Sequence, residues 1–166
     1  AKSLISYDPN WRPNLWKGRQ DALVLMKSLL PFADIVKISD EERTVLFGPN
    51  TSCADAAHRM LQSGATLALI TLGAQGVYYA TPQYSGRLAA PAVKVTDTTG
   101  AGDSFMGGLL YRITRRPEPL QCSQATLEQD LSFANAVASL CVTKRGAIPA
   151  LPSLADVTAF MHTHGM

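Results

Sequence analysis

Short apolar runs alternate along this chain with longer segments whose apolar residues recur at helical spacing. The runs at 4–7, 35–38 and 67–72 have the length of buried strands, and 77–80, directly after the turn at 73–76, completes a hairpin. A last strand is expected near 93–95. Helical spacing predicts helices at 19–30, 40–47, 53–62, 105–114, 127–143 and 154–162. This alternation is typical of an α/β fold with a mainly parallel sheet flanked by helices.

Composition and charge restrict the class of protein. The 166 residues are 46% hydrophobic and 17% charged, which predicts a single domain, 1–166, with room for a core. The 15 basic and 13 acidic residues are scattered, and no basic run is interleaved with aromatic residues, so no nucleic-acid partner is expected. No apolar stretch approaches the roughly 20 residues of a membrane span. We therefore expect no membrane partner either.

The cysteines and the first residues bear on the setting of the protein. Cys53, Cys122 and Cys141 are odd in number and widely spaced, which argues against a disulfide framework and against a zinc site. They indicate a reducing compartment, and we expect the cytoplasm. The chain does not open like a signal peptide, and it runs into a predicted strand without an initiator Met. This start suggests a piece of something longer.

The run at 97–105, Asp-Thr-Thr-Gly-Ala-Gly-Asp-Ser-Phe, is the richest in chemistry. Gly100, Ala101 and Gly102 leave the backbone nearly free of side chains where a helix begins, so successive N–H groups can converge on an anion. Asp103 would lie beside a phosphate bound there. This repulsion is useful if the carboxylate takes a proton from a hydroxyl that attacks a phosphoryl group, while the N–H groups offset the charge on the phosphoryl oxygens.

Other interpretations of these glycines can be weighed in the same way. A P-loop would need Gly followed by Lys and by Ser or Thr at the required spacing, and the sequence contains no such string. A dinucleotide-binding fingerprint would place Phe105 where the third glycine belongs and Asp103 against the pyrophosphate. A structural alternative stays open, in which Thr98 or Thr99 caps the helix and Asp103 only neutralises its dipole.

Five segments follow one another in an order that a known family shares. They are 6–16 (Ser-Tyr-Asp-Pro-Asn-Trp-Arg-Pro-Asn-Leu-Trp), 34–42, 71–76, 97–108 and 133–149. Together they resemble the C-terminal half of the ribokinase-like sugar kinases, also called the phosphofructokinase-B family. The resemblance implies an ATP-dependent carbohydrate kinase, closest to a fructokinase, that transfers the γ-phosphoryl of ATP to a sugar hydroxyl. A 2-keto-3-deoxygluconate kinase is the alternative, because 6–16 is similar to both branches.

The resemblance also implies which residues would act, with Asp103 as the base and the N–H groups of Gly100, Ala101 and Gly102 as the anion hole. It implies ATP contacts at Thr71, Gly73, Gly76, Asn135 and Ala138, an Mg²⁺ role through water for Glu42, and a monovalent-cation (K⁺) site at Asp97, Thr99, Cys141, Lys144 and Gly146. Where the family commonly has Asn, three residues before the Glu, this chain has Ser39.

Several of these residues also have a simpler, structural explanation. Glu42 belongs to an acidic cluster that suits an exposed helix start, and Asn135 could be a surface position on an Ala-rich helix. Asn10 and Arg12 follow the C-terminal end of a predicted strand, where ligands of α/β proteins gather, so they could contact sugar or phosphate. They could equally brace the turn at Pro9.

The resemblance further implies that the N-terminal half, which supplies most of the sugar pocket and the lid, is absent. The expected partners are a small sugar or sugar acid and this missing half. Without it we expect a non-catalytic nucleotide-binding piece. Its uncovered sheet would favour self-association, so a homodimer is expected.

Overall fold

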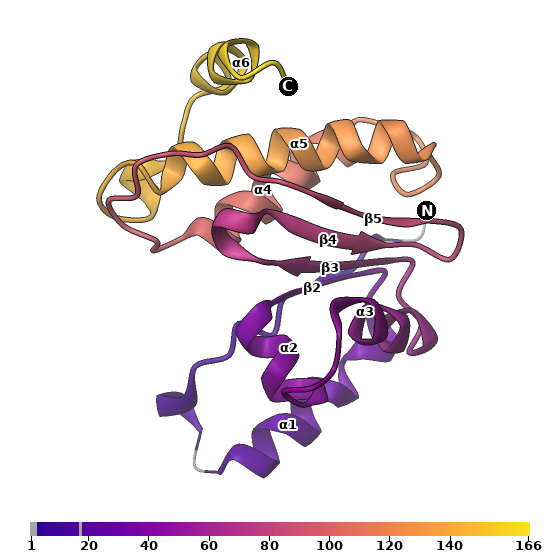
Figure 1. Ribbon diagram of the computed structural model, residues 1–166. Coiled ribbons are helices and arrows are strands. Elements are labelled where there is room, and N and C mark those ends of the chain that lie inside the picture. Colours follow the sequence, from indigo (N-terminus) through magenta and orange to yellow (C-terminus); the bar gives the residue numbers. More distant parts are fainter. Residues whose placement is uncertain (1–2, 17) are drawn as a thin grey trace. The chain divides into compact units, whose positions relative to one another are not determined.

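A computed structural model describes residues 3–16 and 18–166 (Figure 1). The helices and strands are β1 (Ser6–Tyr7), α1 (Arg19–Ser28), β2 (Ile35–Ser39), α2 (Asp40–Phe47), α3 (Cys53–Gln62), β3 (Leu67–Thr71), β4 (Val77–Ala80), β5 (Ser85–Leu88), α4 (Ala101–Ile113), α5 (Gln124–Cys141) and α6 (Leu154–Thr163). They form two compact units. Unit 1 comprises Ala1–Leu72 and Tyr78–Arg87, and unit 2 comprises Gly73–Val77 and Leu88–Met166.

Unit 1 is built on a sheet whose strands lie in the order β1-β2-β3-β4-β5. β1 pairs in parallel with β2, and β2 in parallel with β3, with Ile35 opposite Leu67 and Ile38 opposite Ile70. β4 runs opposite to β3 (Figure 1), so the sheet is mixed. β2 and β3 are buried along their length except at the last residue, as parallel strands usually are, and the buried residues are apolar except Lys37.

The helices of unit 1 gather on one side of this sheet (Figure 1). Side chains from α1, the segment after it, α2, α3, β2 and β3 form its core, among them Met26, Leu30, Val36, Ile38, Leu46, Met60 and Ile70. Ser39 caps α2 in a capping box with Glu42, and Ser52 caps α3 by accepting from the N–H of Asp55. The last residue of β2 is therefore also the start of α2.

Unit 2 is dominated by α4 and α5, which pack closely against each other. A Cβ atom on Gly108 would lie 3.1 Å from Cγ2 of Val137, so the backbones approach at this glycine. Near the C-terminal end of α4, Asp130 of α5 accepts from Nε of Arg112 at 3.0 Å and from Nη1 of Arg116 at 2.6 Å. These contacts fix the helix whose first turn includes Asp103.

Most of the predicted elements are confirmed, and two expectations are wrong. Residues 93–95 form no strand, and the last strand is β5, whose sequence has no apolar alternation. The helix predicted from 105 begins at Ala101, because the left-handed Gly100 starts it four residues earlier. The prediction of a single domain stays a prediction.

Two further expectations concern the chain as a whole. Among the described residues, no disulfide joins Cys53, Cys122 or Cys141. In the part of the chain that the structure describes, no helix is both long and apolar enough to cross a membrane.

Candidate functional site

The glycine run folds into a turn that leads directly into α4. Gly100 is the N-cap, with the left-handed angles φ 80° and ψ 3°, and no side chain caps this helix. A Cβ atom on Gly100 would also lie 2.9 Å from Cβ of Ala147, so both the backbone and its neighbour require glycine. The capping alternative is therefore wrong for Thr98 and Thr99. The hydroxyl of Thr99 instead donates to Oδ1 of Asp97 at 2.7 Å.

The first turn of α4 offers N–H groups to an anion. Such groups have no partner within the helix itself. The N–H of Ala101 donates to the carbonyl of Thr98 at 3.2 Å, and that of Ser104 donates to the carbonyl of Gly100 at 2.8 Å. Among the described residues, no partner is found for the N–H groups of Gly100, Gly102 and Asp103. Two of the three predicted anion-hole donors are therefore open, whereas Ala101 is used within the turn.

A network around Asp97 gives this turn its shape. Oδ1 of Asp97 accepts from the hydroxyl of Thr99 and from its N–H at 2.9 Å, and Oδ2 accepts from the N–H of Gly146 at 2.9 Å. These bonds, the hydroxyl of Thr99 first, lower the pKa of Asp97 from 3.8 to about 2. The N–H groups of Thr96 and Asp97 donate to the carbonyl of Val142 at 2.8 and 3.2 Å. Thus the turn is tied to the segment after α5.

The other two residues predicted for the cation site lie at the same end of α5. Cys141 is its last residue and is buried, while Lys144 follows and is exposed. The N–H of Lys144 donates to the carbonyl of Cys141 at 3.2 Å. The five predicted residues thus belong to two turns, one before α4 and one at the end of α5, that Asp97 links.

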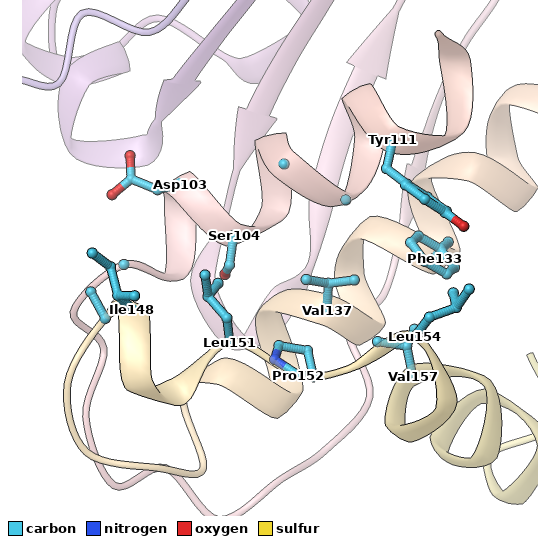
Figure 2. A pocket seen from close by; sticks show the side chains of 14 residues that line it. Asp103, Ser104, Tyr111, Phe133, Val137, Ile148, Leu151, Pro152, Leu154 and Val157 are labelled. Carbon is cyan, nitrogen blue, oxygen red and sulfur yellow. The ribbon is translucent and has the colours of Figure 1, made fainter. Parts of the chain in front are cut away.

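Asp103 lies exposed at one end of a pocket of about 470 Å³ (Figure 2). The pocket is lined by α4 and its N-cap, α5, the segment before α6 and α6 itself, namely Gly100, Asp103, Ser104, Gly107, Gly108, Tyr111, Phe133, Val137, Ala147, Ile148, Leu151, Pro152, Leu154 and Val157. Figure 2 shows Tyr111 and Phe133 at the end away from Asp103. No hydrogen bond or ion pair of the Asp103 carboxylate is found within the described part of the chain. Its oxygens are thus open to contact with a ligand.

Sequence reasoning missed this pocket. Its far end is closed by the rings of Tyr111 and Phe133, which stack with centroids 5.7 Å apart. The pair Gly107-Gly108 was a usable signal, because it leaves one stretch of α4 without side chains. Ile148 lines the other wall and is exposed, as are Leu151 and Leu154.

The residues predicted to contact ATP differ in their surroundings. Thr71 ends β3, and its hydroxyl donates to the carbonyl of Ile38 at 3.4 Å. Gly73 and Gly76 both have left-handed backbones, with φ of 57° and 89°. A Cβ atom on Gly73 would meet nothing within 4 Å, whereas one on Gly76 would lie 1.9 Å from the carbonyl oxygen of Leu88. Gly73 is thus open to a ligand, and Gly76 is required by the fold.

Asn135 and Ala138 lie on α5. Asn135 is buried, and its Nδ2 donates to the carbonyl of Ala89 at 3.3 Å. The surface alternative for Asn135 is therefore wrong. Ala138 is half-buried, almost one helical turn further along.

The acceptor-side residues Asn10 and Arg12 belong to the loop after β1 in unit 1. Both are exposed, and Asn10 has a left-handed backbone with φ 49°. Oδ1 of Asp8 accepts from the N–H of Asn10 at 3.1 Å. Oδ2 of Asp8 lies 2.8 Å from Nζ of Lys37, a buried lysine on β2 that sequence reasoning did not single out. The loop thus combines a fixed backbone with exposed side chains.

Glu42 is buried, with 4% of its surface exposed, so the exposed-helix alternative for it is wrong. Its Oε1 accepts from the N–H of Trp11, and its Oε2 from the N–H of Ser39, both at 2.6 Å. Burial and the charges of Glu42 and Asp8 raise the pKa of Tyr7 to about 12. Within the described residues, no three His, Cys, Asp or Glu side chains are grouped so as to hold a metal ion.

Comparisons with known proteins agree on one family. The model of the "pfkB family carbohydrate kinase" matches residues 1–154. Fructokinase-1 of Oryza sativa subsp. japonica is 40% identical over 163 residues, which are 98% of this chain and 50% of that protein. The chain thus spans about half the length of the curated relatives it matches.

Two solved structures show the same fold. One is a double mutant of fructokinase from Vibrio cholerae O395 in its fructose, ADP and potassium ion bound form, with a TM-score of 0.85 and 37% identity over 93% of this chain and 49% of that one. The other is aminoimidazole riboside kinase from Salmonella enterica, complexed with aminoimidazole riboside and an ATP analog. Its TM-score is 0.84, with 33% identity over 95% of this chain and 52% of that one.

Proposed function

Because the chain belongs to the pfkB family of carbohydrate kinases, we propose that it is the nucleotide-binding and catalytic-base half of an ATP-dependent kinase of the fructokinase type. One observation carries this proposal. An exposed carboxylate, Asp103, stands in the first turn of α4 beside open backbone N–H groups. The carboxylate of Asp103 would serve as the base, and the open N–H groups beside it would bind an anion.

The proposed reaction follows from these groups. A sugar hydroxyl gives its proton to Asp103, and its oxygen forms a bond to the γ-phosphorus of ATP as the bond from that phosphorus to ADP breaks. The N–H groups of Gly100 and Gly102 stabilise the negative charge on the transferred phosphoryl group. Thr71, Gly73, Asn135 and Ala138 are proposed to contact ATP.

The residues predicted to hold Mg²⁺ and those predicted to hold K⁺ suit these ions to different degrees. Both carboxylate oxygens of Glu42 already accept backbone N–H groups, and the side chain is buried, so Glu42 does not fit the role of a direct Mg²⁺ ligand. We propose that Mg²⁺ arrives with ATP, where it neutralises phosphate charge. A K⁺ site at the turns around Asp97 has some support, because Asp97 joins the turn at 97–99 to Gly146, and it stays a prediction.

Fructose is the proposed acceptor. The fructokinases among the relatives support this choice, and the comparisons do not favour a 2-keto-3-deoxygluconate kinase. The Salmonella enterica neighbour, whose name gives a riboside as its substrate, makes a riboside the second candidate. Asn10 and Arg12 are proposed to contact the acceptor or the phosphate. A cytoplasmic location stays a prediction.

The remaining half of the relatives' length is proposed to cover the pocket of unit 2. Apart from Asp103, Ser104 and Tyr111 its lining is apolar, which suits a protein side chain better than a sugar. Ile148, Leu151 and Leu154 are exposed beside it. Light scattering of the 166-residue chain, with and without the N-terminal half added in trans, tests this. A 1:1 complex supports the proposal, whereas a homodimer that the added half does not dissociate contradicts it.

The test of the function is Asp103→Asn in the full-length kinase. The amide fills the same volume but cannot take the hydroxyl proton, so kcat should fall by roughly 10² to 10⁴ while the affinity for ATP is unchanged. Sugar-dependent release of ADP measures the rate. Ser104→Ala, at a neighbouring position that also lines the pocket, is the matched control. A kcat for Asp103→Asn within about threefold of wild type would refute the base assignment.

A further inference from the structure

The loop after β1, residues 8–12, is held by side chains from two other elements of unit 1. Oε1 of Glu42 accepts from the N–H of Trp11 across 31 residues of sequence, while Oε2 accepts from the N–H of Ser39. The N–H of Glu42 in turn donates to Oγ of Ser39 at 3.1 Å. One carboxylate therefore joins the loop to the first turn of α2.

The second anchor is an ion pair. Lys37 extends from β2, is 5% exposed, and places Nζ 2.8 Å from Oδ2 of Asp8. The other oxygen of Asp8 accepts from the N–H of Asn10, whose φ of 49° is left-handed, a conformation that is uncommon outside glycine although asparagine adopts it more readily than most residues. A left-handed asparagine persists where surrounding contacts determine the backbone. Lys37 and Asp8 supply such contacts.

Glu42 and the ion pair of Lys37 with Asp8 fix the backbone of residues 8–12, and two polar side chains of this loop point to the surface. Asn10 and Arg12 are exposed, although the N–H of Trp11 between them is bonded to a buried carboxylate. Nη1 of Arg12 donates to the carbonyl of Trp11 at 3.0 Å, so the guanidinium at the end of this side chain is itself held against the loop. The exposed side chains therefore stand on a fixed support.

We infer that Glu42 and Lys37 are positioning residues, which hold residues 8–12 so that Asn10 and Arg12 meet the acceptor, and that Glu42 does not bind Mg²⁺. The inference rests on the proposed function for the identity of the acceptor. Mg²⁺ requires several oxygen ligands at short distance. If Glu42 turned toward a metal ion, the buried N–H groups of Trp11 and Ser39 would lose their acceptor.

The experiment compares Glu42→Gln with Glu41→Gln in the full-length kinase. Glu41 is the neighbouring exposed acid of the same helix turn and serves as the matched control. We expect Glu42→Gln to raise the KM for fructose about tenfold, as the loss of one hydrogen bond would. The Mg²⁺ concentration that gives half-maximal rate should stay unchanged. A raised Mg²⁺ requirement at an unchanged KM would overturn the inference, as would two unchanged constants.

Two further measurements keep the test informative. Lys37→Met removes the other anchor without touching Glu42, and the same rise in KM is expected. In the 166-residue chain, amide hydrogen exchange at Trp11 should become at least about tenfold faster in Glu42→Gln. Unchanged exchange at Trp11 would contradict the positioning role. The exchange measurement does not require turnover, so it distinguishes the two proposals. A wild-type kinase that fails to phosphorylate fructose would contradict the proposed function, whereas the exchange rate at Trp11 decides the positioning role of Glu42.

Discussion

The ion pairs of Asp130 allow a prediction about the support of the proposed base. Asp130 is 1% exposed and binds Arg112, near the C-terminal end of α4, and Arg116, which follows that helix. α4 is also the helix whose N-cap is Gly100, at the proposed anion site. Replacing Asp130 by asparagine keeps the shape and one carbonyl acceptor for Arg112. It removes the charge, however, and turns an NH₂ group toward Nη1 of Arg116. Two donors would then face each other in a buried place.

The size of the effect follows from exposure. Removing one partner of a buried ion pair costs about 3 to 5 kcal/mol. Here the side chains of Arg112 and Arg116 are 40% and 24% exposed, so water can hydrate them once the charge is lost. We therefore expect a loss of about 2 to 3 kcal/mol in the free energy of unfolding. For a chain of this length the melting temperature should fall by about 4 to 12 °C.

Thermal unfolding of the 166-residue chain, followed by circular dichroism, measures this change. The matched control is Glu118→Gln, an exposed acid in the segment after α4, which should melt within about 1 °C of wild type because exposed charges contribute little. A melting temperature for Asp130→Asn equal to that of the control would refute the reasoning.

Three further predictions concern turns. Gly76→Ala should destabilise the chain by more than about 3 kcal/mol, measured by urea unfolding, because its Cβ would meet a backbone carbonyl at 1.9 Å; a normal midpoint would contradict this. Gly102→Val should weaken ATP binding in a nucleotide titration more than it lowers the melting temperature, because the side chain blocks the approach of phosphate, and the reverse order would speak against the anion turn. The lowered pKa of Asp97 means that its contribution to stability is present above about pH 4 and is lost as the pH falls toward 2. Melts over this range should show less acid sensitivity in Asp97→Asn than in wild type, and equal sensitivity would contradict the assignment.

Local sequence determined much of what could be predicted. β3 is an uninterrupted apolar run up to Thr71, and β2 is apolar up to Ser39 except at Lys37. α2 and α3 are each preceded by a serine that caps them. β5 could not be predicted, since Ser-Gly-Arg-Leu has no strand pattern. A Cβ atom on Gly86 would lie 2.5 Å from the hydroxyl of Tyr79 on β4, so this glycine fits a place made by the neighbouring strand.

The candidate site also contains some features that the sequence predicts and others that it does not. The glycine run and Asp103 could be recognised because their chemistry lies in consecutive residues. The hydrogen bond from Trp11 to Glu42 could not be predicted, because the spacing of residues along the chain does not show which N–H group a carboxylate will meet 31 residues away. A lysine within the apolar run of β2 was the available signal, since a buried charge requires a partner.

The bond between Asp97 and Gly146 spans 49 residues, and this has a consequence for the order of folding. A chain made from its N-terminus can form its early strand pairs before its end is available, whereas contacts distant in sequence form late and slowly. The turn of the proposed anion site receives its shape from residues 142–147, which are synthesised after both of the helices α4 and α5. The proposed anion site would therefore take shape late, and a nascent polypeptide that stops at the end of α5 would hold the proposed base without the residues that shape the turn beside it.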